Sequence, residues 1–209
     1  MATGEISLGV EAHAPASDVG LFEQCRAGDP QAFARLVALH ESMVWNLAAR
    51  LLGDPEEARD VAQDVFLQVY RTLARFEGRS SLKTWIYRIV VNQCHNRRRF
   101  WMRRARKGTR ALEELTAADE IRLAESRPGR DDPYEQLRRR ERQRRVQAAL
   151  LELSFAHRTV LLLHEVEGLS CEAIAATLQV REGTVKSRLA RAREALRRRL
   201  AQRGPEEVA

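Results

Sequence analysis

Three Asp-Pro pairs, at positions 29–30, 54–55 and 132–133, constrain the fold of this chain more than any other feature. Aspartate caps the first turn of a helix, and proline is favoured at the first helical position because its missing N–H needs no partner there. Apolar residues recur at helical spacing after each pair, and no segment alternates with a period of two. The sequence therefore predicts an all-α protein.

The N-terminal half predicts four helices within residues 17–106. The first is capped by Ser17 or Asp18 and ends near Gly28, and the second runs from Pro30 to Gly53. The third starts at Pro55 and runs to about Arg75, and the fourth is capped by Ser81 after a break at 76–80. The expected apolar faces of the last three helices contain Leu36, Leu39, Met43 and Leu47; Ala58, Val61, Ala62, Val65, Val69 and Leu73; and Leu82, Trp85, Ile86, Ile89 and Val90.

The second half predicts a separate helical domain. Residues 107–132 are rich in Asp and Glu and contain Gly108, Pro128 and Gly129, which predicts a flexible acidic linker. Helices are expected over 133–151, 154–166, 170–178 and 182–200. The expected organisation is a disordered tail (1–16), a helical domain (17–106), the linker (107–132), a second helical domain (133–203) and a short tail (204–209).

The charge of the chain indicates a polyanionic partner. The 36 Lys and Arg residues exceed the 29 Asp and Glu residues, which gives a formal net charge of +7, and the excess is clustered. No phosphate-binding loop, dinucleotide-binding glycine motif or nucleophile turn is found, so an enzymatic function has no motif to support it. We expect a binding protein without catalytic residues.

Cysteine and histidine spacing argues against a metal or cofactor. Cys25, Cys94 and Cys171 form no Cys-x-x-Cys pair, and the five histidines have no metal-ligand spacing. We expect no signal peptide, and no apolar run approaches the roughly 18 to 20 residues that a membrane-spanning helix needs. We expect a reduced, cytoplasmic protein with no cofactor, no metal and no membrane insertion.

The strongest local motif is a helix-turn-helix over residues 169–193. Small Ala175 lets its two helices approach, and apolar residues such as Ile174 and Val185 fill the space between them. The second helix offers cations and hydroxyls outward, which suit phosphates and guanine edges in a major groove. The alternative is an ordinary solvated basic helix.

Residues 167–170 and 183–193 resemble the fourth conserved region of the extracytoplasmic-function sigma factors, a group of bacterial RNA polymerase subunits. The resemblance implies contacts to the minus-thirty-five promoter element as duplex DNA. The implied residues are Arg181, Thr184, Lys186, Ser187, Arg188 and Arg191. Gln179 stands where the family usually has glycine, and a left-handed glutamine would cost up to about 1 to 2 kcal/mol, so we expect a less tight turn.

Residues 76–99 resemble the promoter-melting segment of the same family, which combines a basic face with aromatic rings suited to single-stranded DNA. Trp85 lies on the apolar stripe and has plain core packing as its alternative, whereas Tyr87 is the stronger surface candidate. The candidates for the minus-ten element and single-stranded DNA are Phe76, Gly78, Arg79, Ser80, Ser81, Lys83, Trp85, Tyr87, Arg88, Asn92 and Asn96.

Glu56, Asp60 and Asp64 recur every four residues and place like charges along one edge of the third helix. A basic partner would explain the part of this repulsion that the helix dipole does not relieve. Residues 57–66 resemble the family's second region, which docks on the coiled coil of the largest polymerase subunit. The implied core-polymerase residues are Asp60, Gln63, Asp64 and Phe66, with a merely solvated face as the alternative.

The resemblance implies a subunit that binds core RNA polymerase at the coiled coil and the flap, recognises promoter DNA and promotes its melting in a stress- or signal-responsive regulon. An anti-sigma partner is a further possibility, and the acidic linker is expected to thread the polymerase channel or to act as a passive tether. Two other functions stay open. One is a self-sufficient helix-turn-helix regulator, and the other uses the arginine-rich helix ends as membrane-surface anchors.

Overall fold

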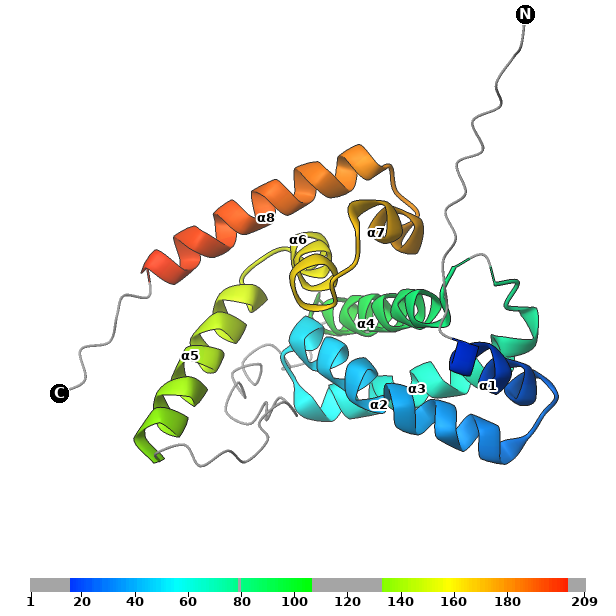
Figure 1. The fold of residues 1–209 in the computed structure, drawn as a ribbon. Helices are drawn as coiled ribbons and strands as arrows, with labels where there is room; N and C mark the ends of the chain where they lie inside the picture. Colours follow the sequence, from blue (N-terminus) through cyan, green and yellow to red (C-terminus); the bar gives the residue numbers. More distant parts are fainter. Residues whose placement is uncertain (1–15, 79, 107–132, 203–209) are drawn as a thin grey trace, which may run out of the picture.

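The structure is a computed structural model that describes residues 16–78, 80–106 and 133–202. Within these ranges every regular element is a helix, which confirms the predicted fold class. Four helices form an N-terminal unit, and four more, after the gap, form a C-terminal unit (Figure 1). No described helix is long and apolar enough to cross a membrane.

The N-terminal unit contains α1 (Ala16–Arg26), α2 (Pro30–Leu52), α3 (Pro55–Thr72) and α4 (Leu82–Arg106), with a 3-10 turn at Leu73–Arg75. The Asp29 and Asp54 carboxylates accept hydrogen bonds from N–H groups in the first turns of α2 and α3, as expected of aspartate before proline. Ser81 accepts from the backbone of Thr84 at 3.1 Å and so caps α4. The first helix begins at Ala16, so Ser17 and Asp18, the expected caps, lie inside it.

The C-terminal unit contains α5 (Pro133–Leu151), α6 (Phe155–Leu161), α7 (Cys171–Leu178) and α8 (Glu182–Gln202). A π turn at Leu162–Val166 extends α6, which completes the helix predicted over 154–166. The hydroxyls of Ser154 and Ser170 cap α6 and α7. They accept hydrogen bonds from the backbone N–H groups of His157 and Ala173, at 3.3 and 3.1 Å.

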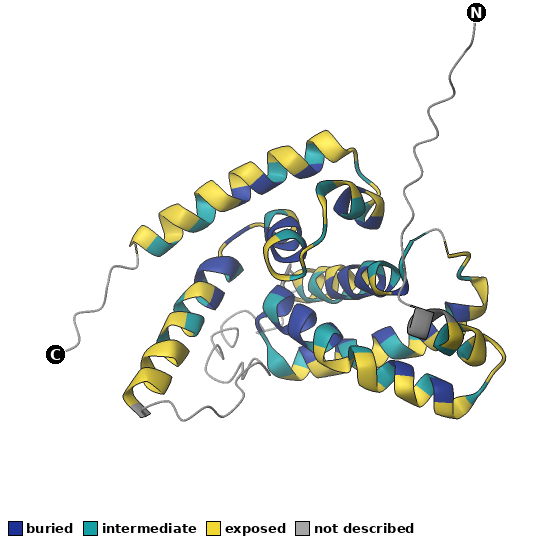
Figure 2. Cartoon of the chain, viewed as in Figure 1, coloured by how far each residue is buried: buried dark blue, intermediate teal, exposed yellow. Residues whose placement is uncertain are grey.

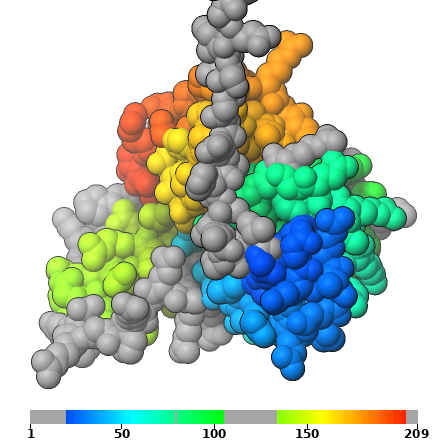
Figure 3. All heavy atoms as spheres, turned by 45° about the vertical axis from the view of Figure 1, so that its right-hand side comes forward, coloured from blue at the N-terminus to red at the C-terminus, as the bar shows by residue number. Residues whose placement is uncertain are grey.

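The two units pack against each other, and their buried apolar residues form a continuous cluster. The end of α2 meets the end of α5, and α7 lies against α4. Figure 3 shows from another side how the yellow and orange C-terminal unit lies over the green surface of α4. Gly53 is in the left-handed region (φ 79°), and a Cβ there would stand 2.5 Å from the Leu151 side chain, so glycine is favoured at this junction.

Leu39 departs from the predicted apolar face of α2. Its side chain is 64% exposed, although Leu36 and Leu47 on the same helix are fully buried. Helical spacing predicts that Leu39 lies on the same side of α2 as the buried leucines. How wide a strip of that side is buried depends on which neighbouring helices cover it. Leu39 lies beyond the edge that they cover.

Candidate nucleic-acid interfaces

The helix-turn-helix is built by α7 and α8 around a left-handed turn. Gln179 has φ 55° and ψ 46°, and is the only residue other than glycine with positive φ in the described ranges. The N–H of Val180 still donates to the carbonyl of Ala175 at 3.1 Å, so the tight turn forms in spite of the glutamine. The expectation of a looser turn was therefore wrong, because tertiary packing of α7 against α8 outweighs the local backbone cost. Ile174 and Val185 are fully buried between these helices.

The outward face of α8 carries the predicted duplex contacts. Lys186, Ser187 and Arg191 are exposed, and Thr184 and Arg188 are partly exposed. Arg181 is exposed in the preceding turn. Figure 2 shows the outer side of α8 as a nearly continuous exposed band.

Two local interactions hold this face in order before any ligand binds. The Lys186 ammonium donates to Glu182 at 2.7 Å, and this hydrogen bond raises the pKa of Lys186. The Ser187 hydroxyl donates to the carbonyl of Thr184 at 3.0 Å. Both groups are on the surface, so a phosphate oxygen can replace either partner.

The α4 helix presents part of the predicted single-strand surface. Lys83, Asn92 and Asn96 are exposed, and Arg88 is partly exposed. Gly78, Ser80 and Ser81 lie in the loop that precedes the helix, and Arg79 lies outside the described residues.

Phe76 and Trp85 share an aromatic cluster with Phe22 of α1. The Phe76 ring centroid lies 5.1 Å from that of Trp85 and 5.2 Å from that of Phe22. Both Phe76 and Trp85 keep partial exposure. Trp85 therefore packs inside the N-terminal unit, as its alternative interpretation of core packing predicts, while part of its ring surface stays open to solvent.

Tyr87 is not a surface residue, so this prediction is wrong. Its side chain is only 1% exposed, and its hydroxyl donates to the Glu167 carboxylate at 2.5 Å. Helical periodicity placed Tyr87 on the basic face of α4, but Glu167 belongs to the C-terminal unit, 80 residues away in the chain. Burial and the nearby carboxylate raise the pKa of Tyr87, so the hydroxyl stays a donor at neutral pH.

Asp60 and Asp64 of the acidic edge of α3, together with Glu57 beside it, face a single arginine of α4. Arg97 lies 3.1 Å from Glu57, 3.5 Å from Asp64 and 3.9 Å from Asp60. The like charges thus share an internal cation, so their repulsion alone no longer requires an outside basic partner. Asp60 and Asp64 remain more than half exposed, at 63% and 52%, and can still contact one.

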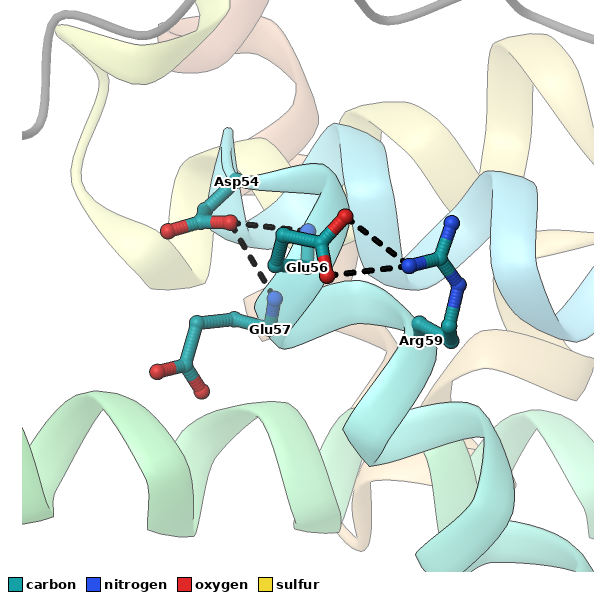
Figure 4. A network of polar contacts seen from close by, with 4 residues as sticks. All are labelled: Asp54, Glu56, Glu57 and Arg59. Atoms are coloured by element: carbon teal, nitrogen blue, oxygen red, sulfur yellow. Dashed lines mark hydrogen bonds and ion pairs between the residues drawn. The ribbon is translucent and has the colours of Figure 1, made fainter.

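Figure 4 shows the start of this acidic edge. Glu57 points from α3 toward α4, whereas Glu56 pairs with Arg59 of its own helix at 2.8 Å. Asp54 caps the helix through the N–H groups of Glu56 and Glu57, at 2.9 and 3.1 Å. Burial raises the pKa of Glu57 even though Arg97 acts in the opposite direction.

Exposed apolar residues adjoin the predicted polymerase-binding residues. Gln63 is exposed and Phe66 is partly buried against the core. Leu67 and Tyr70 on α3 are 52% and 64% exposed, and the Tyr70 ring contacts Phe33 of α2 at 5.1 Å. Sequence reasoning missed Leu67 and Tyr70, although apolar residues on the polar side of an amphipathic helix are a readable signal.

A hollow of about 370 Å³ lies between α2, α5 and the π turn, and sequence reasoning missed it as well. Its lining surface is mostly apolar, and three arginines are among the residues that line it. The lining residues are Arg50, Arg139, Arg142, Gln143, Val146, Gln147, Leu150, Leu162 and Val166. The hollow joins segments almost a hundred residues apart, so no local pattern could have indicated it.

Comparisons with known proteins agree with this division into two units. Residues 36–106 match the family described as Sigma-70 region 2, and residues 143–196 match Sigma-70, region 4. The RNA polymerase sigma-H factor of Pseudomonas aeruginosa is 36% identical and covers 86% of this chain and 91% of its own length. The ECF RNA polymerase sigma factor SigW of Bacillus subtilis is 32% identical, over 85% of this chain and 94% of its own.

Among solved structures, the sigma factor RpoE of Bartonella quintana, in complex with the anti-sigma factor NepR, has the same fold. The TM-score is 0.63 at 24% identity, with 81% of this chain and 96% of that chain covered. At this identity the likeness concerns the fold alone.

Proposed function

The chain belongs to the extracytoplasmic-function group of RNA polymerase sigma factors, and from this membership we propose a division of labour between its two units. It is a transcription regulator that directs RNA polymerase to promoters for initiation. We infer that the N-terminal unit binds core polymerase and opens the minus-ten element, and that the C-terminal unit recognises the minus-thirty-five element as duplex.

The exposed basic face of α8 is the observation that supports duplex recognition most strongly. Arg188 and Arg191 lie one turn apart on a helix that a packed partner helix holds in place, as in helix-turn-helix proteins. Guanidinium groups match the paired acceptors of guanine and the phosphate oxygens. We propose that Arg181, Thr184, Lys186 and Ser187 complete this contact surface by binding phosphates.

Core polymerase binding is proposed for the exposed side of α3. Asp60, Gln63 and Asp64 supply polar and charged groups, and Leu67 and Tyr70 supply exposed apolar area next to them. A mixed surface of this kind is typical of protein interfaces, where apolar anchors give affinity and charges give orientation. Phe66, on the partly buried side of α3, packs against the core and holds the helix in place.

We propose that the polymerase flap binds in the hollow between α2 and α5. Its mostly apolar lining and its three arginines suit an apolar helix with acidic flanks. The acidic linker expected at 107–132 lies outside the described residues, and its passage through the polymerase channel stays a prediction.

Strand opening is proposed for α4 and the loop before it. Lys83, Asn92 and Asn96 offer cationic and amide groups to a single strand, and the Phe76 and Trp85 rings lie at the end where bases would be held. We infer that the chain acts by binding alone, in the cytoplasm where polymerase works. An anti-sigma factor of the kind bound to the Bartonella protein is a proposed regulator here.

Transcription with purified core polymerase and a promoter library tests this function. Specific transcripts should require the chain and should fall at least tenfold in the Asp60→Lys/Asp64→Lys variant. The Glu41→Lys/Glu135→Lys variant makes the same change in net charge at exposed positions elsewhere and should retain transcription. A chain that shifts duplex DNA but is ignored by core polymerase would instead be a self-sufficient regulator.

A further inference from the structure

One buried arginine joins the two units. Arg158 of α6 is only 5% exposed, and its guanidinium donates to the carbonyl of Leu51 at the end of α2. It also donates to the carbonyls of Leu150 and Leu151 at the end of α5, at 2.9 and 2.7 Å, and to that of Leu153 just after this helix, at 3.2 Å. Burial lowers the pKa of Arg158 to about 10, so it remains a cation at neutral pH.

Arg158 therefore caps a helix of each unit at once. The last carbonyls of a helix lack partners within it and carry partial negative charge, which a cation satisfies. Beside it the Gln147 amide donates to the carbonyl of Arg50 at 3.3 Å. These hydrogen bonds join the end of α2 to the end of α5, and we call this junction the anchor.

The C-terminal unit also lies against α4, through α7 and through individual side chains of α6 and of the segment before α7. The Phe155 ring stacks on His95 at 5.5 Å, and the Arg98 guanidinium lies 5.7 Å from the centre of the same ring. Nearer the start of α4, Tyr87 donates its hydrogen bond to Glu167. The contacts thus follow the helix that carries the proposed single-strand surface.

The closed arrangement keeps the Tyr87 ring off that surface, because the ring is part of the buried cluster that both units form and its hydroxyl is bonded to Glu167. Lys83 remains exposed, with its ammonium 5.7 Å from the centre of the Tyr87 ring, and Asn92 and Asn96 are also exposed. A phosphate backbone can reach these groups, but a base cannot stack on a ring that is 1% exposed. Glu167 places a carboxylate, which also repels phosphates, at the edge of the same site.

We propose that Tyr87 and Glu167 form a lock that holds the free chain closed and keeps Tyr87 from single-stranded DNA until the two units separate. The proposal rests on the function assigned above to α4. Interfaces between domains of one chain are commonly transient, so loss of a single charge-assisted hydrogen bond can shift their equilibrium. Opening about the Arg158 junction would remove the carboxylate and uncover the ring together.

The distance between the units tests the lock without DNA or polymerase. Spin labels on ketone-bearing amino acids at Ser42 and Ala201, both exposed, leave the cysteines of the full-length chain unmodified. We expect one main distance for the unchanged chain, and at least a threefold larger open population in Tyr87→Phe and in Glu167→Ala. The double variant should resemble either single variant, because both remove the same contact.

Two control variants show whether an effect is specific to the lock. They remove the same kind of group, a tyrosine hydroxyl or a glutamate carboxylate, at another place in the chain. Tyr134→Phe and Glu41→Ala alter exposed residues on α5 and α2 and should leave the distances unchanged. Closed distances in both lock variants would overturn the proposal. Inactivity with core polymerase would refute the proposed function, while the distances would still decide on the lock.

Binding of a single-stranded promoter oligonucleotide tests the consequence of opening. A ligand that needs the open form binds with an affinity reduced by the open fraction, so Glu167→Ala should bind about three- to tenfold more tightly. Glu41→Ala makes the same change in net charge and should gain much less. Equal gains in both variants would mean that charge alone acts, and would refute occlusion by Glu167.

Discussion

The two basic helices α4 and α8 begin from similar sequence patterns but differ in what the fold leaves accessible. On α8, Lys186, Ser187 and Arg191 remain exposed, and the partly exposed Arg188 lies beside them. On α4, the ring expected at the surface is buried, and its hydroxyl is bonded to a carboxylate of the other unit. A helix face is available for recognition only if no distant part of the chain packs on it. Four predictions test this contrast.

The largest effect is expected from Arg158→Met, which removes the cation shared by the two units. Four carbonyls lose a donor, and each buried group left unpaired costs about 1 to 3 kcal/mol, partly relieved by water. We expect the free energy of unfolding to fall by about 3 kcal/mol, measured by chemical denaturation. Arg138→Met, at an exposed arginine of α5, should change it by less than about 0.5 kcal/mol. Equal effects would show that Arg158 does not join the units.

The next largest effect concerns the open face of α8. Arg188→Ala/Arg191→Ala should weaken binding of minus-thirty-five duplex by roughly a hundredfold, since each base or phosphate contact contributes about 1 to 3 kcal/mol. Fluorescence anisotropy at fixed salt measures this loss. Arg197→Ala lies near the far end of α8, where the arginine pairs with Glu194, and should cost far less. Similar losses in both would place the duplex elsewhere on the helix.

A smaller effect is expected at the turn that orients α8. Gln179→Gly relieves the left-handed backbone and should raise the free energy of unfolding by about 1 kcal/mol. Thermal melting should show a higher midpoint with duplex affinity preserved. Gln143→Gly, within α5, should lower the midpoint instead, because helical glycine is unfavourable. A lower midpoint for Gln179→Gly would mean that the glutamine side chain stabilises the turn.

The smallest effect is expected at the pairing of α3 with α4. Arg97→Ala should lower the free energy of unfolding by less than about 1 kcal/mol, because its pairs with the exposed Asp60 and Asp64 contribute little and only the pair with Glu57 is partly buried. The loss should shrink in high salt, which screens the repulsion between Asp60 and Asp64. Denaturation at two ionic strengths measures the difference. If the loss in the free energy of unfolding does not change with salt, Arg97 acts by packing of the aliphatic part of its side chain instead.

The helices and the helix-turn-helix were predictable because their signals are local. Asp29 and Asp54 cap the helices that follow them, and Ser81 caps α4. The buried stripe of α3, including Val61, Val65 and Val69, follows the expected spacing. These features depend on residues three or four positions apart, so a single sequence reveals them.

Other features required the fold, because their partners come from distant segments. Leu39 and Tyr87 were misplaced for this reason: one extends beyond the covered side of α2, and the other is covered by Glu167. Arg97 gathers three carboxylates from another helix, and no spacing within α4 indicates this role.

The sequence by itself determined the all-helical class, most helix starts, the family and the basic face of α8. Capping, amphipathic spacing and charge act over a few residues and need no knowledge of the rest of the chain. Tertiary structure alone decided that Arg158 caps helices of both units and that Glu167 covers Tyr87. Burial and hydrogen bonding between distant segments depend on how the helices pack, so they emerge only when the whole chain is folded.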